Sequence, residues 1–75
     1  MSQDRKAMLE NVGKVLYGER WQTGLARDLG LPDGRRIRQW LADERPIPGG
    51  IQDALRHLLE ERKGQIEAAL KSISE

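Results

Sequence analysis

The sequence predicts an all-α fold, built as a small bundle of four to five helices. Apolar residues recur at intervals of three and four along most of the 75 residues, which is the spacing of one helical face. Strict alternation of apolar and polar residues, the pattern of a half-buried strand, occurs nowhere. A chain of this length allows one domain, and it carries no internal repeat, so residues 1–75 are expected to fold as a single domain.

The first helix is expected from about residue 4 to residue 17. Its inward face consists of apolar residues at helical spacing: Met8, Leu9, Val12, Val15 and Leu16. Gly18 follows directly and provides a stop, because glycine ends helices readily in the left-handed conformation.

Two short helices are expected next, separated by a tight turn. The first spans residues 21–29 and is closed by Gly30, and residues 31–33 form the turn. Asp33 can accept a hydrogen bond from the start of the second helix, which is expected over residues 34–42. Each helix has one apolar face, formed by Leu25, Ala26 and Leu29 in the first and by Ile37, Trp40 and Leu41 in the second.

The last third of the sequence contains one loop and one long helix. Residues 43–50 hold two prolines and two glycines, which rule out a continuous helix there, and Ile47 is expected to insert into the core. A long amphipathic helix is expected over residues 51–73, with Gly64 as the point where it could kink or end. Its apolar positions are Ile51, Leu55, Leu58, Leu59, Ile66, Leu70 and Ile73.

The composition excludes several functional classes. There is no cysteine, which rules out a disulfide framework, a catalytic thiol and a cysteine-ligated zinc site and fits a reducing compartment. No apolar run approaches the roughly 18 residues needed to span a membrane, and no signal-type apolar stretch follows the first residues. We therefore expect a cytoplasmic protein without a membrane partner.

The distribution of charge contains one basic cluster. The net charge is only +1, and basic and acidic residues nearly balance in each part of the chain. Arg35, Arg36 and Arg38 form the only tight basic group, mostly on the outward face of the helix expected over residues 34–42. Any contact with nucleic acid should therefore be local, with modest long-range attraction. The lack of a broad basic surface also disfavours an architectural DNA-binding role without sequence preference.

The segment over residues 21–41 resembles the helix-turn-helix of the Cro and lambda-repressor-like (XRE-like) family, in its small phage and bacterial members. The resemblance rests on Leu25, Ala26, Leu29, Gly30 and Leu31, followed by Ile37 and Trp40, and extends over about residues 9–59. It implies a lambda-repressor-like fold and a sequence-specific transcriptional repressor that reads the major groove of double-stranded DNA with the helix over residues 34–42. The turn is one residue longer than is usual in the family, so positions are carried over by aligning Ile37 and Trp40.

On that alignment, the groove-facing positions of the family match residues 33–36, 38, 39 and 42. Arginine binds guanine and glutamine binds adenine through paired hydrogen bonds, so the expected base contacts are Arg35, Arg38 and Gln39. Side chains on the flank of this helix and at the start of the preceding one are expected to contact phosphate. These are Arg36, Gln22 and Thr23, with Arg27 and Arg45 as further contacts at the rim.

The same residues also allow a purely structural interpretation. The arginines could form a solvated face paired with nearby carboxylates, for which the candidates are Asp28, Asp33, Asp43 and Glu44. Trp40 is expected in the core, with Trp21 and Tyr17 in or beside it. His57 is expected on the surface, without a second histidine or a cysteine to complete a metal site. We expect no catalytic residue, cofactor or small-molecule substrate, and the protein is not expected to be an enzyme.

The apolar stripe over residues 66–73 leaves two outcomes open, since it can dimerise the protein or fold back on the first helix. A homodimer is expected, because one small module buries only about 600–1,000 Å² on DNA and two-fold dimers read half-sites about 34 Å apart. The alternative to a DNA-binding protein is a protein-interaction module, such as an antitoxin or an adaptor that docks a partner on its last helix. Such a module should expose Ile66, Leu70 and Ile73.

Overall fold

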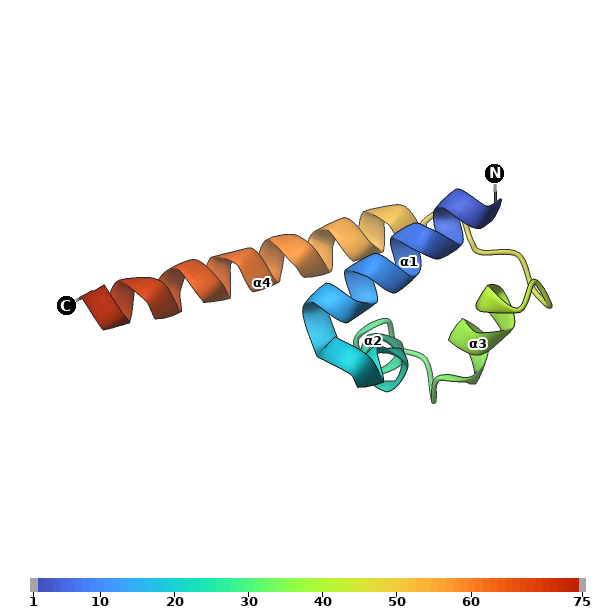
Figure 1. Ribbon diagram of the computed structural model, residues 1–75, viewed down its shortest axis with the longest axis horizontal. Coiled ribbons are helices and arrows are strands. Elements are labelled where there is room, and N and C mark those ends of the chain that lie inside the picture. Colours follow the sequence, from blue (N-terminus) through green and yellow to red (C-terminus); the bar gives the residue numbers. More distant parts are fainter. Residues whose placement is uncertain (1, 75) are drawn as a thin grey trace.

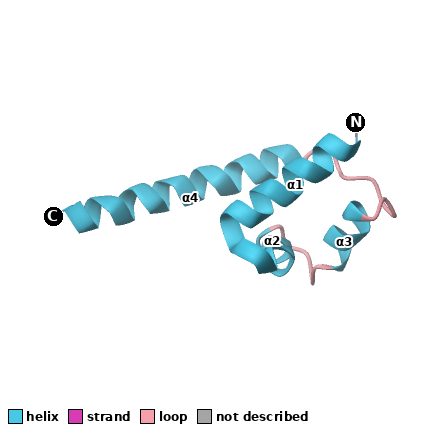
Figure 2. Ribbon diagram, in the orientation of Figure 1, coloured by secondary structure: helices cyan, strands magenta, loops and turns pink. Residues whose placement is uncertain are grey.

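The computed structural model describes residues 2–74, which form four α-helices and one short 3-10 helix. In chain order they are α1 (Ser2–Tyr17), η1 (Gly18–Arg20), α2 (Trp21–Asp28), α3 (Arg35–Leu41) and α4 (Ile51–Ser74). This described part of the chain contains no β-strand, as Figure 2 shows. The predicted all-α class is therefore confirmed.

The helices pack around α1, which contacts α2, η1 and α4. α1 and the first part of α4 run side by side in the same direction, and α2 and α3 lie on one side of this pair (Figure 1). The last part of α4 extends beyond the other helices, so that the molecule measures 49 × 24 × 19 Å. The helices therefore do not form the small bundle of four to five helices that the sequence predicts.

The apolar stripe over residues 66–73 does not fold back on the first helix, which corrects one of the two outcomes left open by the sequence. α1 ends at Tyr17, and Gly18 directs the chain away from the line of α1 into η1 and α2. As a result, no other helix of the described residues lies opposite the end of α4.

One hydrophobic core joins all four α-helices. Its buried residues are Leu9, Val12, Leu16, Trp21, Leu25, Ala26, Ile37, Trp40, Ile51 and Leu55. The core positions predicted for Trp21 and Trp40 are confirmed, and Tyr17 and Ile47 pack against the cluster as half-buried residues. Val15 does not belong to it, contrary to the prediction, and is 66% exposed. Val15 lies at the edge of the apolar stripe of α1, about 100° around the helix from Leu16.

Two glycines end helices as the sequence predicts. Gly18 and Gly30 have φ angles of 78° and 80°, in the left-handed region that glycine adopts at little cost. Past Gly30, the N–H of Leu31 donates to the carbonyl of Ala26 at 2.8 Å, which satisfies a carbonyl group at the end of α2. The 3-10 helix η1 between α1 and α2 was not expected from the sequence.

The loop that follows α3 is fixed to the start of α1. The Nζ atom of Lys6 lies 2.5 Å from Oδ2 of Asp43. Arg5 donates from Nη1 to the carbonyl of Ile47 at 3.0 Å. These two contacts hold the end of α3 close to α1, although the loop itself is mostly exposed.

α4 is a single helix from Ile51 to Ser74, so the expectation that it kinks or ends at Gly64 is wrong. A glycine inside a helix costs only about 1 kcal/mol relative to alanine, and the residues on both sides of Gly64 are strong helix formers. No helix among residues 2–74 is both long and apolar enough to cross a membrane.

Candidate nucleic-acid interface

α2 and α3 are joined by a tight turn, and each helix packs on the core through one face. Ala26 of α2 and Ile37 of α3 are both fully buried. The backbone N–H of Arg35, the first residue of α3, donates to Oδ1 of Asp33 at 2.8 Å, as predicted, although the N-cap position itself is occupied by Gly34. The turn therefore fixes where α3 begins, and the core fixes which of its faces points outward.

The outward face of α3 carries the arginine cluster. Arg35, Arg36 and Arg38 are exposed, and Gln39 is half-buried. Arg35 and Gln39 are four residues apart, so both lie near the centre of this face, opposite the buried Ile37. Arg36 and Arg38 lie on its two flanks. The cluster is thus spread across the helix and does not form one compact group.

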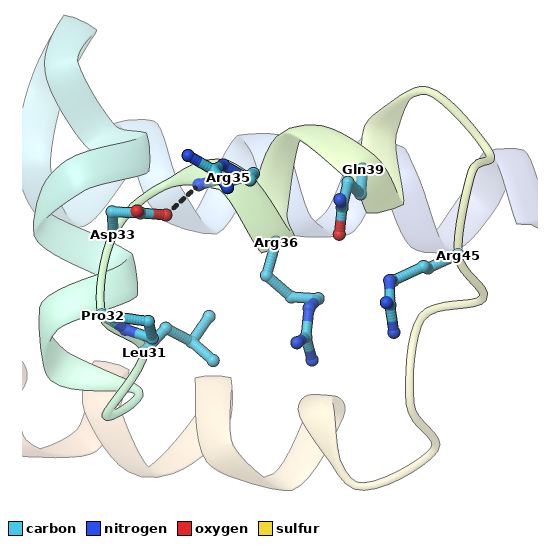
Figure 3. A pocket seen from close by; sticks show the side chains of 7 residues that line it. All are labelled: Leu31, Pro32, Asp33, Arg35, Arg36, Gln39 and Arg45. Atoms are coloured by element: carbon cyan, nitrogen blue, oxygen red, sulfur yellow. Dashed lines mark hydrogen bonds between the residues drawn. The ribbon is translucent and has the colours of Figure 1, made fainter.

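A hollow lies on one side of α3, between the turn before the helix and the loop after it. Its lining consists of Leu31, Pro32, Asp33, Arg35, Arg36, Gln39 and Arg45. Figure 3 shows the side chains of Arg36, from α3, and Arg45, from the loop after it, extending toward the same region, with Gln39 between them. The structure therefore brings the predicted base contacts Arg35 and Gln39 together with two predicted phosphate contacts, Arg36 and Arg45.

A second hollow lies on the opposite flank of α3. It is lined by Thr23 and Arg27 of α2, by turn residues 30–34, and by Arg38 of α3. The Nη1 atom of Arg38 reaches back over Gly34, where a Cβ atom would lie only 3.1 Å from it. The structure therefore places Arg38, a predicted base contact, beside the predicted phosphate contacts Thr23 and Arg27.

The start of α2 offers a favourable place for an anion. Gln22 and Thr23 lie in its first turn, where Gln22 is half-buried beside Gly34 and Thr23 is exposed. This turn contains no acidic residue, and no side chain caps it. The free N–H groups and the dipole at the start of a helix attract negative charge. Both residues are therefore placed where a phosphate contact is favourable.

Most arginines around α3 have no ion-pair partner among the described side chains. No carboxylate of these side chains lies within 4.0 Å of the guanidinium nitrogens of Arg35, Arg36, Arg38 and Arg45. Arg27 differs, because its Nε atom lies 3.8 Å from Oδ1 of Asp28. The ion pairs with nearby carboxylates that the structural interpretation allowed are therefore not formed by these four residues among the described side chains.

The carboxylates closest in sequence are engaged elsewhere. Asp43 pairs with Lys6 of α1, and Asp33 accepts the hydrogen bond at the start of α3. Asp28 accepts a hydrogen bond from the hydroxyl of Tyr17 at 2.5 Å. Three of the four acidic residues considered as partners for the arginines are thus bound to other groups.

Tyr17 forms a link between helices that the sequence did not signal. The guanidinium of Arg62, on α4, lies 5.7 Å from the centre of the Tyr17 ring, and it also donates to the carbonyl of Leu16 at 2.7 Å. Burial, together with the hydrogen bond to Asp28 and its charge, raises the pKa of Tyr17 to about 12. The hydroxyl therefore stays protonated and keeps Asp28 in this link. Tyr17 and Asp28 are 11 residues apart, and no local pattern connects them.

The described residues contain no cluster of three or more histidine, cysteine, aspartate or glutamate side chains that could hold a metal ion. His57 is exposed and lies 3.4 Å from Glu61, one helical turn further along α4. The predicted surface position of His57 is confirmed.

No family model matches the chain, and no curated protein or solved structure shows significant similarity to it. Function is therefore inferred from the geometry and charge of the surface around α3.

Proposed function

We propose that this chain is a sequence-specific DNA-binding protein that places α3 in the major groove of double-stranded DNA. The observation that supports this proposal most is the set of guanidinium groups on the outer side of α3 and its adjoining loop that have no carboxylate partner among the described side chains. They belong to Arg35, Arg36, Arg38 and Arg45. Guanidinium groups spread across the outer side of one helix and its adjoining loop favour a polyanion, and phosphate matches their hydrogen-bonding geometry.

The order of the elements supports a helix-turn-helix of the lambda-repressor-like type. In such a motif the second helix enters the major groove, and the first crosses the DNA backbone. α2 and α3 have this order, and both are held on the core by buried residues, Ala26 and Ile37. The turn between them is one residue longer than is usual in the family, so we expect α3 to be tilted relative to the usual docking.

The positions of the side chains favour distinct roles. Arg35 and Gln39, at the centre of the outward face, are placed to read base edges, as is Arg38 if its side chain swings outward from Gly34. Arg36 and Arg45 share one hollow and are placed to contact phosphate on one side of the groove. Thr23 and Arg27, with Gln22, take the same role on the other side.

A transcriptional repressor in the cytoplasm of a bacterium, encoded by the bacterium or a phage, is the form of this function that we propose. A small domain seated over a promoter can block transcription by occupying the site. The described residues contain no second domain that could bind an effector. Regulation would then depend on protein concentration and self-association.

The test is binding of the purified protein to a fluorescent duplex of random sequence, measured by anisotropy at several salt concentrations. We expect binding at low salt. The logarithm of the binding constant should fall with the logarithm of the salt concentration, with a slope of about −0.9 for each phosphate neutralised. Arg36→Ala should weaken binding. The control, Arg56→Ala, removes the same charge from an exposed position on α4 and should leave binding unchanged. Equal losses in the two variants, or no binding at low salt, would count against the proposal.

A second candidate function is a protein-interaction module, such as an antitoxin or an adaptor. It is favoured by the exposure of Ile66, Leu70 and Ile73 on α4, which such a module requires. The net charge of +1 also fits this function. Because a module of this kind would not bind DNA even at low salt, the same measurement separates the two candidates.

A further inference from the structure

A continuous apolar surface remains open on α4 and the end of α1. The exposed large apolar side chains among the described residues are Val15, Ile66, Leu70 and Ile73, at 66%, 52%, 59% and 80% exposure. The first two line one groove, together with Leu16, Leu59, Arg62, Lys63 and Glu67. The other two continue the same face of α4 toward its end. Single exposed apolar residues are ordinary, but a contiguous patch marks an interaction site.

We propose that a second copy of this chain covers this surface, with the two α4 helices antiparallel and a two-fold axis beside Ala69 and Leu70. The surface lies on the extension of α4, at the other end of the molecule from α3 (Figure 1). Self-association is therefore separate from DNA binding, and it can be measured without DNA.

The spacing of apolar residues makes α4 complementary to itself in this orientation. In an antiparallel pair related by a two-fold axis, a residue before the axis faces a residue equally far beyond it. With the axis beside residues 69 and 70, Ile66 of one copy faces Ile73 of the other. Leu70 then packs beside Ala69, whose small side chain lets the helices approach closely. Each of these contacts occurs twice, because the interface is the same patch on both copies.

This register also gives the groove a defined occupant. Val15 of α1 and Ile66 of α4 both line the groove. Since Ile73 of the second copy faces Ile66, its side chain comes to rest beside Val15 as well. The most exposed apolar side chain on α4 thus fills the groove that the end of α1 leaves open.

The charged residues of α4 fit the same register. Lys63, Glu67 and Lys71 recur at intervals of four along one flank of the apolar stripe, and the opposite flank is uncharged from residue 65 to residue 72. In an antiparallel two-fold pair, each flank meets the same flank of the other copy. Glu67 then lies one residue away from the position directly opposite Lys71 of the second copy, in both directions, so that the two long side chains can reach each other and form two ion pairs. A parallel pair would place the charged flank against the uncharged one and lose them.

The test is the mass of the protein in solution without DNA, measured by sedimentation equilibrium over a range of concentrations up to about 1 mM. We expect reversible association from 8.5 kDa to twice that mass. Leu70→Glu should raise the dissociation constant at least about ten-fold. The control, Ala68→Glu, adds the same charge on the opposite face of α4 and should leave association unchanged. Both sites are exposed, and circular dichroism checks that both variants fold.

Three outcomes of this experiment would overturn the proposal. They are a protein that stays at 8.5 kDa at the highest concentration, equal losses in the two variants, and an assembly larger than two copies. A protein that stays monomeric would leave the surface to an unlike partner.

Charge reversal tests the antiparallel register directly. Glu67→Lys places lysine at both positions of the pair, and Lys71→Glu places glutamate at both, so each variant alone should dimerise less than the wild type. A mixture of the two should form a heterodimer, because each lysine then faces a glutamate of the other chain. If the mixture associates no better than the separate variants, the antiparallel register is wrong.

Discussion

Replacing Gly13 by alanine should destabilise the fold, although the same change usually stabilises a helix by about 1 kcal/mol. A Cβ atom at Gly13 would lie 2.1 Å from Cε3 of Trp21, so the indole would have to move by about 1.3 Å to reach the 3.4 Å of ordinary contact. The indole is only 3% exposed and is packed in the core. Overpacking costs about 1–3 kcal/mol, and a displacement of this size belongs at the upper end. Subtracting the gain in helix propensity, we expect a net loss of about 2 kcal/mol.

Gly64→Ala is the matched control. Gly64 lies inside α4, and apart from its chain neighbours and its own helical backbone nothing lies within 4 Å of the position of an added Cβ. This variant should therefore show only the gain in helix propensity, about 0.5–1 kcal/mol. Both variants can be compared with the wild type by urea unfolding, followed by circular dichroism and tryptophan fluorescence. We expect the urea midpoint of Gly13→Ala to be lower by about 1–2 M and the midpoint of Gly64→Ala to be equal or higher. A Gly13→Ala variant as stable as the wild type would show that Trp21 does not pack over Gly13.

Three further measurements address the links between helices and the proposed DNA contacts. Tyr17 is the only tyrosine, so ultraviolet absorbance follows its titration alone; we expect a midpoint near 12 in the folded protein. Because folding raises this pKa, the contribution of Tyr17 to stability is complete below about pH 10 and is lost as the pH rises toward 12. A folded midpoint near 10 would contradict the hydrogen bond to Asp28. Arg36→Ala should reduce the salt slope of DNA binding by about 0.9. Arg38→Ala should reduce the preference for a sequence selected from a random pool over other sequences by about 1–3 kcal/mol, and equal losses of affinity on every sequence would argue against base reading by Arg38. Arg62→Met removes the hydrogen bond to the Leu16 carbonyl and the cation over the Tyr17 ring, so unfolding in urea should show a loss of about 1–3 kcal/mol, and unchanged stability would mean that neither contact forms in solution.

The core could be predicted from the sequence because its residues recur at local spacings that any helix would place on one face. Ile37 and Trp40 are three residues apart on α3, and both are buried. Leu25 of α2 lies on the apolar face of its helix and is buried as well. The turn after α2 was also predictable, since Gly30 adopts the left-handed conformation that favours glycine over other residues. These features depend on a few neighbouring residues and on little else.

Features that depend on where one helix ends relative to another could not be predicted. The repeat of apolar residues in α4 is regular as far as Ile73, but whether a neighbour covers the stripe depends on the length of α1 and on the direction of the chain after Gly18. The spacing of Val15 predicts a core position for the same reason, whereas in the structure Val15 lines an open groove beside α4 and stays 66% exposed. Periodicity identifies a face, and only the fold determines whether that face is buried.

The electrostatic character of the surface around α3 has its origin in the two turns that flank the helix. Asp33, before α3, uses its carboxylate to accept a backbone N–H. Asp43, after α3, has a φ angle of 63°, a left-handed conformation that aspartate tolerates better than most residues, and its carboxylate pairs with Lys6, 37 residues earlier in the chain. Both residues are close enough in sequence to neutralise the arginines of α3, and each is bound to another group. A protein with a net charge of only +1 can therefore present guanidinium groups that no described side chain pairs with, because its turns direct the nearby carboxylates elsewhere.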